Sequence, residues 1–169
     1  MKLSLIGSAD TASQSIIQHG LQAGYQIVAH DDHFLHVRNR SKCISVDGNS
    51  MGMSTLNKIV KQGDAVLYNI ANVTAKIDEV KAMITLLIAT MSTHRVGRLV
   101  LFMDADLLLL RDKISETIIT DSLWHKSLLS LLSNSTLDWT FIVVGAKFTR
   151  SVICQVTDVQ HLQDTVLVV

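Results

Sequence analysis

Short runs of consecutive apolar residues alternate along this chain with longer stretches in which apolar residues recur every three or four positions. The expected strands occupy 2–7, 25–29, 43–47, 64–71, 97–103 and 138–144. The continuous apolar run at 64–71 is typical of a strand covered on both faces. The other spacing is typical of helices. Strands that alternate with helices in this way predict an α/β fold: a three-layer, doubly wound parallel sheet of about six strands with helices on both faces.

The helical spacing is clearest between about Ala75 and Thr93. The apolar residues on that helical face are Val80, Met83, Ile84, Leu87, Ile88 and Met91. Further helices are predicted over 11–23, 56–60 and 123–132, and a short strand followed by a small helix over 151–169. Gly24 and Gly63 follow two of these helices and are expected to end them, because glycine readily adopts the left-handed conformation at a helix terminus.

Composition limits the class of protein. With 169 residues, 48% of them hydrophobic, the chain is expected to form one domain, 1–169, around a single core. The formal net charge is zero, which argues against nucleic acid or an anionic membrane as a partner. The first apolar run is too short for a signal peptide and no run is long enough to span a membrane, so a cytoplasmic protein is expected. Cys43 and Cys154 lack metal-type spacing, which favours buried thiols.

The first turn has the order of a dinucleotide-binding βαβ unit. An apolar strand ends at Gly7, small and polar residues lead into a helix at about Thr11, and the next strand is followed by Asp31 and Asp32. In such a unit the turn lets the backbone approach a pyrophosphate. The helix N-terminus offers unpaired N–H groups, and the later acid binds the ribose hydroxyls.

The glycine motif of such a turn is degenerate in this chain. A G-x-x-G-x-x-G register that starts at Gly7 places Asp10 and Ser13 at the second and third glycine positions. A carboxylate at Asp10 would repel a pyrophosphate. Asp and Ser are also good N-cap residues, which stabilise a helix with no ligand present. The residues therefore leave two interpretations open: a nucleotide-binding turn, or an empty turn that caps a helix.

Seven segments together suggest a family. They are Leu-Ile-Gly-Ser-Ala at 5–9, Ala-Gly-Tyr-Gln-Ile-Val-Ala at 23–29, Val-Asp-Gly at 46–48, Gly-Asp-Ala-Val-Leu at 63–67, His-Arg-Val-Gly-Arg-Leu-Val at 94–100, Ser-Thr-Leu-Asp-Trp-Thr at 135–140 and Val-Thr-Asp-Val at 156–159. In these segments the chain resembles the NmrA-like branch of the atypical short-chain dehydrogenase/reductases, which includes the small flavin and biliverdin reductases. The resemblance covers nearly the whole length.

The resemblance implies that NAD(P) binds along the carboxyl edge of the sheet. The matching positions are Gly7, Ser8, Ala9, Asp10, Thr11 and Ala12 for the pyrophosphate, Asp31 and Asp32 for the ribose, Asp47 and Gly48 for the adenine, and Ala71 and Asn72 for the middle of the cofactor. Two carboxylates at 31 and 32 would repel a 2′-phosphate, so NAD is expected rather than NADP.

The chain also departs from this family where catalysis is concerned. Classical members use a Tyr-x-x-x-Lys pair on the helix after the fifth strand, whereas the only tyrosines here are Tyr25 and Tyr68. Relatives end the fifth strand in Ser or Thr, and this chain has Met103 and Asp104 there. The segment that would form a substrate site, between the sixth strand and the last helix, is short. No catalytic residue is assigned.

Other clusters are interpreted as structural. The segment 30–36 offers several metal ligands, His30, Asp31, Asp32, His33 and His36, but no other segment matches them, so a solvated loop and no metal are predicted. His125 is interpreted as a surface histidine and Trp124 as a core residue. Asp104 and Asp106 are interpreted as a solvated pair rather than a general base.

Three functions follow as hypotheses. The first is a weakly catalytic or non-catalytic dinucleotide-binding protein, a sensor whose bound state is read by a protein partner. The second is a small oxidoreductase that transfers hydride from NADH to a flavin or quinone, because such chemistry is carried by the cofactor and does not require a protein acid. The third is a ligand-free oligomerisation module.

Overall fold

The structure is a computed structural model, which describes residues 1–7, 11–30, 41–48, 52–61, 63–70, 77–104, 123–144, 152–154 and 167–168. The strands are β1 (Lys2–Gly7), β2 (Gln26–His30), β3 (Cys43–Val46), β4 (Ala65–Asn69), β5 (Arg98–Asp104), β6 (Asp138–Val144), β7 (Val152–Cys154) and β8 (Leu167–Val168). The helices are α1 (Thr11–Gln22), α2 (Met53–Val60), α3 (Ile77–His94) and α5 (Leu123–Ser133).

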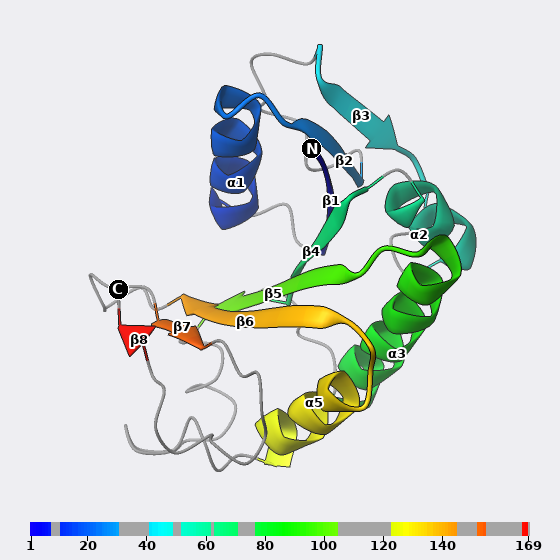
Figure 1. The fold of residues 1–169 in the computed structure, drawn as a ribbon, viewed down its shortest axis with the longest axis vertical. Helices are drawn as coiled ribbons and strands as arrows, with labels where there is room; N and C mark the ends of the chain where they lie inside the picture. The colour runs from blue at the N-terminus through cyan, green and yellow to red at the C-terminus, as the bar shows by residue number, and fades with distance from the viewer. Residues whose placement is uncertain are drawn as a thin grey trace.

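The described strands form one sheet with the order β3-β2-β1-β4-β5-β6-β7-β8 (Figure 1). The strands β1 to β6 all pair in parallel, which confirms the predicted parallel sheet of about six strands. β7 confirms the short strand expected at the start of 151–169, whereas its antiparallel pairing at the β6 edge and the addition of β8 were not predicted. A short antiparallel addition needs no crossover helix, so helical periodicity in the sequence cannot indicate it.

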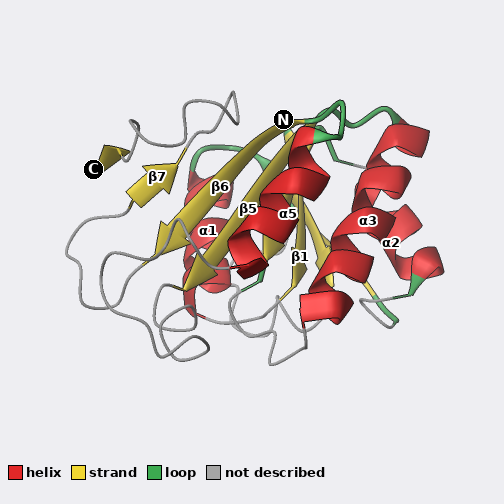
Figure 2. Ribbon diagram, turned by 90° about the horizontal axis from the view of Figure 1, so that it is seen from below, coloured by secondary structure: helices red, strands yellow, loops and turns green. Residues whose placement is uncertain are grey.

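Helices cover both faces of this sheet, as predicted. Figure 2 shows α1 on one face and α2, α3 and α5 on the other. The arrangement follows from right-handed crossovers: β1 to β2 runs toward one end of the sheet, and β4 to β6 runs toward the other, so their helices lie on opposite faces. The larger core cluster lies under α2, α3 and α5, and the smaller one lies between α1 and the sheet.

Five of the six residues of the predicted stripe of α3 lie in the larger core, and the sixth, Ile88, is partly buried against it. The side chains of Val80, Met83, Ile84, Leu87 and Met91 are at most 1% exposed. Because each buried aliphatic or Met side chain contributes roughly 1.5–3 kcal/mol of hydrophobic free energy, this helix is a principal stabiliser of the fold.

Two glycines of the sequence pattern have different roles. Gly24 has φ +85° and follows α1, and Tyr25 N–H donates to the Gly20 carbonyl at 2.9 Å, so Gly24 ends the helix as predicted. Gly63 lies beyond the end of α2 and is not left-handed. A Cβ atom there would lie 2.1 Å from Ser4 Oγ, so this glycine is required by close packing against β1.

Several predictions fall outside the described residues, among them the small helix expected through Val159, Leu162 and Val166. No described helix combines the length and the apolar character needed to cross a bilayer. Cys43 lies half-buried on β3. Cys154 lies on β7, six strand spacings away, roughly 25–30 Å in a sheet, which excludes a disulfide between them within one chain.

Candidate functional site

The candidate site lies where β1 and β4 end side by side. The chain runs from β1 toward β2 and β3 in one direction and from β4 toward β5 and β6 in the other, so the sheet reverses its winding between β1 and β4. In open α/β sheets the crevice outside the carboxyl ends of the strands, at such a switch point, is where ligands bind. The residues that end these two strands, Gly7 and Asn69, are paired in register.

Gly7 can only be a glycine. Its φ is +107°, and a Cβ atom would lie 2.0 Å from the Asn69 carbonyl oxygen. A backbone atom of a central strand cannot move away, so any side chain at position 7 would push β1 and β4 apart. The sequence prediction of Gly7 as the surviving first glycine therefore has a structural basis: it lets two strand ends approach without a side chain between them.

Ser13, at the third glycine position, forms a buried contact of its own. Asn69 Nδ2 donates a hydrogen bond of 2.8 Å to Ser13 Oγ, and both residues are fully buried. In the intact motif the third glycine permits close packing of the helix. In this chain a small hydroxyl residue occupies the position and joins α1 to the end of β4. The sequence interpretation missed Asn69, although an asparagine that ends an apolar strand was a usable signal.

The N-terminus of α1 points toward the same edge. Thr11 and Ala12 begin the helix, and its first turn carries no acidic residue. The first N–H groups of a helix have no partner within the helix and carry a partial positive charge, which favours an anion. Three predicted residues of the intervening turn, Ser8, Ala9 and Asp10, lie outside the described residues.

A second part of the edge is formed by the turn after β3. Asp47 and Gly48 are both exposed there, and Gly48 has φ +124°. His30, the last residue of β2, donates a hydrogen bond from Nε2 to the Gly48 carbonyl oxygen. The turn after β3 is thereby held against the end of β2. Four predicted residues lie outside the described part of the chain: Asp31, Asp32, Ala71 and Asn72.

Neither tyrosine is available for proton transfer at this edge. Tyr68 is 2% exposed within the core cluster under α2 and α3, and burial raises its pKa to about 12. Tyr25 precedes β2, at the opposite edge of the sheet. The sequence holds no other tyrosine, so it offers no candidate for a Tyr-x-x-x-Lys pair on the helix after the fifth strand.

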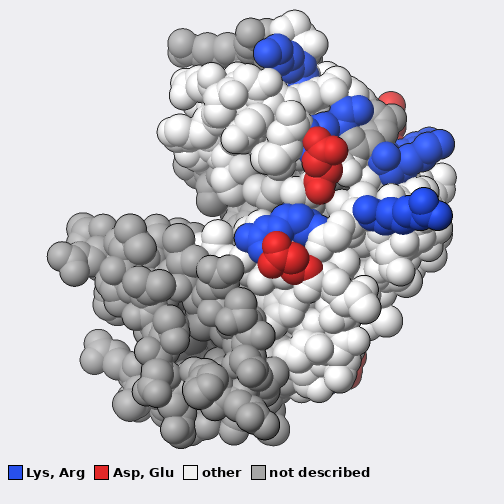
Figure 3. Space-filling view, in the orientation of Figure 1, with Lys and Arg blue, Asp and Glu red and all other residues white. Residues whose placement is uncertain are grey.

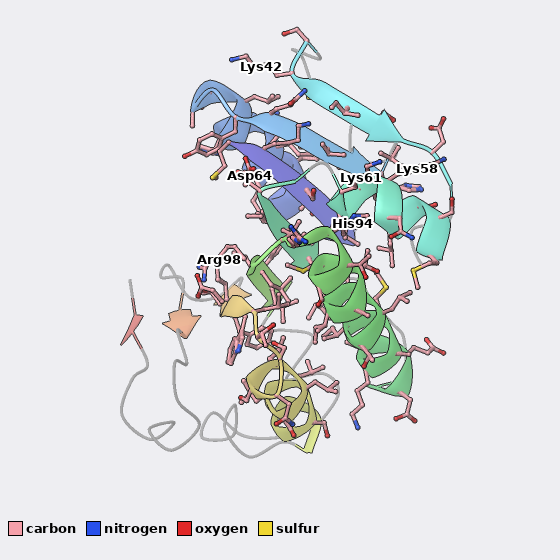
Figure 4. All side chains as sticks on the ribbon, turned by 45° about the vertical axis from the view of Figure 1, so that its right-hand side comes forward. Lys42, Lys58, Lys61, Asp64, His94 and Arg98 are labelled. Atoms are coloured by element: carbon pink, nitrogen blue, oxygen red, sulfur yellow. The ribbon has the colours of Figure 1, made fainter. Side chains whose placement is uncertain are left out.

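The opposite, amino-terminal edge carries a group of basic side chains (Figure 3). Figure 4 shows Lys58, Lys61, His94 and Arg98 along it, at the C-terminal ends of α2 and α3 and the start of β5. Basic residues stabilise helix C-termini, and Arg98 is paired with Asp138 at 2.8 Å. Arg98 therefore has a structural role that links β5 to β6.

Within the described residues, no three His, Cys, Asp or Glu side chains gather in a way that could hold a metal ion. Most of the segment 30–36, with its histidines and aspartates, lies outside those residues. The side chains of Asp104, Trp124 and His125 likewise belong to the part that is not described.

No family model and no curated protein matches the sequence. Among solved structures, one match is a Rossmann-fold NAD(P)-binding family protein from Shigella flexneri, with 14% identity and a TM-score of 0.61 over 84% of this chain and 66% of that one.

Two further matches have similar scores. One is the Bordetella bronchiseptica enzyme WbmH, solved in complex with NAD+, with 17% identity and a TM-score of 0.61 over 85% of this chain and 55% of that one. The other is ChuY, an anaerobillin reductase from Escherichia coli, with 14% identity and a TM-score of 0.56 over 83% of this chain and 71% of that one. The chain spans 66% of the Shigella flexneri structure and 55% of WbmH. These comparisons show that the chain has the Rossmann fold.

Proposed function

We propose that this chain binds a nicotinamide dinucleotide, as an NmrA-like protein of the atypical short-chain dehydrogenase/reductase type, and that it acts as a nucleotide sensor with weak catalysis or none. The observation that carries the proposal is the contact of Gly7 with Asn69 at the switch point of the sheet. It places a side-chain-free strand end next to the first turn of α1, the arrangement in which a backbone can approach a pyrophosphate.

The residues present fit such a cofactor. Gly7 keeps the strand end free of side-chain atoms, and the first turn of α1 supplies amide donors for two phosphates. Asp47 is exposed beside Gly48 at the β3 end, where the resemblance expects the adenine. When bound, the dinucleotide would supply hydride chemistry, and the chain would hold its adenosine and pyrophosphate parts.

A sensor is favoured over an efficient enzyme because the described edge offers no buried acid or base. Tyr68 keeps its proton inside the core and cannot serve the site. We further propose NAD as the preferred form, since the two carboxylates of Asp31 and Asp32 follow β2 directly and would repel a 2′-phosphate. A protein partner would then read the bound state.

The second candidate is an NADH-dependent oxidoreductase that reduces a flavin or quinone. It is supported by the structural likeness to ChuY, a reductase, and by the fact that hydride transfer from NADH needs positioning more than a protein acid. A third, a ligand-free module, predicts that neither nucleotide binds.

Calorimetric titration with NADH and NADPH at physiological salt tests these functions. Binding of NADH with little binding of NADPH supports the proposal, and Asp47→Ala should then weaken NADH binding. Lys81→Glu, on the body of α3, is a control that should leave the affinity unchanged. Oxidation of NADH upon addition of FMN or a quinone would favour the oxidoreductase. No binding of either nucleotide at millimolar concentration would contradict the proposal.

A further inference from the structure

The end of β2 and the turn after β3 are joined by one side chain. His30 is paired in the sheet with Val46, and its Nε2 donates to the carbonyl of Gly48, two residues further along. The strand ladder does not reach Gly48, because β3 ends at Val46. The backbone pairing of β2 with β3 ends at His30 and Val46, and the imidazole of His30 adds one contact beyond it, to Gly48.

On its other side, Gly48 lies against α2, although it is exposed to solvent. A Cβ atom on it would lie 2.5 Å from Thr55 Oγ1, and Thr55 is 6% exposed in the first half of that helix. The φ of +124° is one that side-chain-bearing residues rarely adopt. Gly48 thus lies between the ring of His30 and the hydroxyl of Thr55, and its position is fixed by β2 and α2 together.

Packing alone does not account for a histidine at position 30. Val28, two residues earlier and therefore on the same face of β2, is fully buried in the core cluster under α2, whereas His30 lies half-buried at the end of that row. An apolar residue would cover the end of the core equally well. The histidine supplies a directional donor, which an apolar residue would lack, and this donor holds the Gly48 turn.

We propose that His30 is a positioning residue for the adenosine end of the site, and that the preformed turn lets an adenine mononucleotide bind without the nicotinamide half. The inference rests on the proposed function, which places the adenine at Asp47 and Gly48. A turn that is already ordered costs little conformational entropy when a ligand binds. Because His30 contacts the turn where the adenine is expected, a substitution at position 30 should change the affinity only for ligands that contain adenosine.

The test compares two substitutions at position 30 with a matched control. His30→Leu keeps a bulky side chain without a donor, and His30→Gln keeps a donor. His94→Ala removes another bridging histidine, whose Nε2 lies 2.9 Å from Asn57 Oδ1 between α3 and α2, at the opposite edge. Each protein is titrated with AMP, NADH and reduced nicotinamide mononucleotide, and its urea midpoint is measured in parallel.

We expect AMP to bind the unsubstituted chain. His30→Leu should weaken AMP and NADH by the same factor, about 3- to 10-fold, as for one lost hydrogen bond, with reduced nicotinamide mononucleotide unaffected. His30→Gln should stay within about twofold, and His94→Ala should change the urea midpoint but no affinity.

If His30→Leu and His94→Ala change the AMP affinity equally, or if a folded His30→Gln loses AMP binding, the positioning role is wrong while dinucleotide binding stands. If the unsubstituted chain binds neither NADH nor AMP, the proposed function fails, and the role of His30 fails with it.

Discussion

Asn69 Nδ2 donates a hydrogen bond of 2.8 Å to Ser13 Oγ, and neither residue is exposed to solvent. The contact joins the first full turn of α1 to the end of β4, at the point where the sheet reverses its winding. The hydroxyl that breaks the glycine motif thus has a defined partner in the fold. Where the motif has a glycine that permits close packing, this chain has a serine that joins α1 to β4 by a hydrogen bond.

The substitution Ser13→Ala tests this contact. It removes the acceptor of a buried amide, so we expect a loss of about 1–3 kcal/mol in the free energy of unfolding, measured by urea denaturation. Ser15→Ala, on the exposed side of the same helix, is the matched control and should cost less than about 0.5 kcal/mol. Equal losses for the two variants would contradict a special role for the buried pair.

Gly7→Ala and Gly24→Ala separate steric contact from backbone conformation. Both glycines have positive φ, but a Cβ atom at Gly24 meets no atom within 4 Å, whereas at Gly7 it meets the Asn69 carbonyl oxygen at 2.0 Å. We expect Gly24→Ala to cost about 1 kcal/mol and Gly7→Ala at least about 2 kcal/mol more. Thermal unfolding of both variants measures the difference, and similar melting temperatures would refute the close approach.

Tyr68 should make the stability fall at high pH. Burial raises its pKa from 10.0 to about 12, so the folded state favours the protonated phenol. The contribution is fully present below pH 10 and is lost as the pH rises from 10 to 12, by up to about 2–3 kcal/mol. Urea denaturation of the unsubstituted chain and of Tyr68→Phe between pH 8 and 11.5 measures it. The free-energy difference between the two proteins should change only above pH 10.

Asp10→Gly should tighten NADH binding. The glycine register places Asp10 where the second glycine of the motif faces the pyrophosphate, and removal of a carboxylate there relieves repulsion between like charges. The expected gain is several-fold at low salt and smaller at high salt. Asp138→Asn, at the opposite edge, serves as the charge-matched control. Unchanged or weaker NADH affinity for Asp10→Gly would show that Asp10 does not face the ligand.

The fold could be predicted from the sequence because its strands are short apolar runs between helical patterns. The β6 boundaries Asp138–Val144 coincide with the predicted run, and α3 lies within two residues of the predicted helix at each end. The spacing of apolar residues predicts these elements because each buried strand or helix must present apolar side chains to the core. Their order along the chain then fixes the parallel sheet through right-handed crossovers.

The site could be predicted only in part. Gly7, Asp47 and Gly48 lie at the carboxyl edge, where the sequence placed them. The partners of these residues were missed: Asn69 is far from Ser13 in sequence, and His30 was interpreted only as part of a polar loop. Contacts of this kind depend on which strand ends are neighbours, and local spacing carries no information about that.

The short connection between β6 and β7 limits how the candidate site could be enclosed. β6 ends at Val144, and β7 begins at Val152, beside Val143. Both ends of the connecting segment are thus anchored at the carboxyl edge, and seven residues can reach roughly 25 Å even when fully extended. Because chain added to such a connection costs little loop entropy, inserting a longer segment between 145 and 151 offers a direct way to build a lid over the site while the sheet stays as it is.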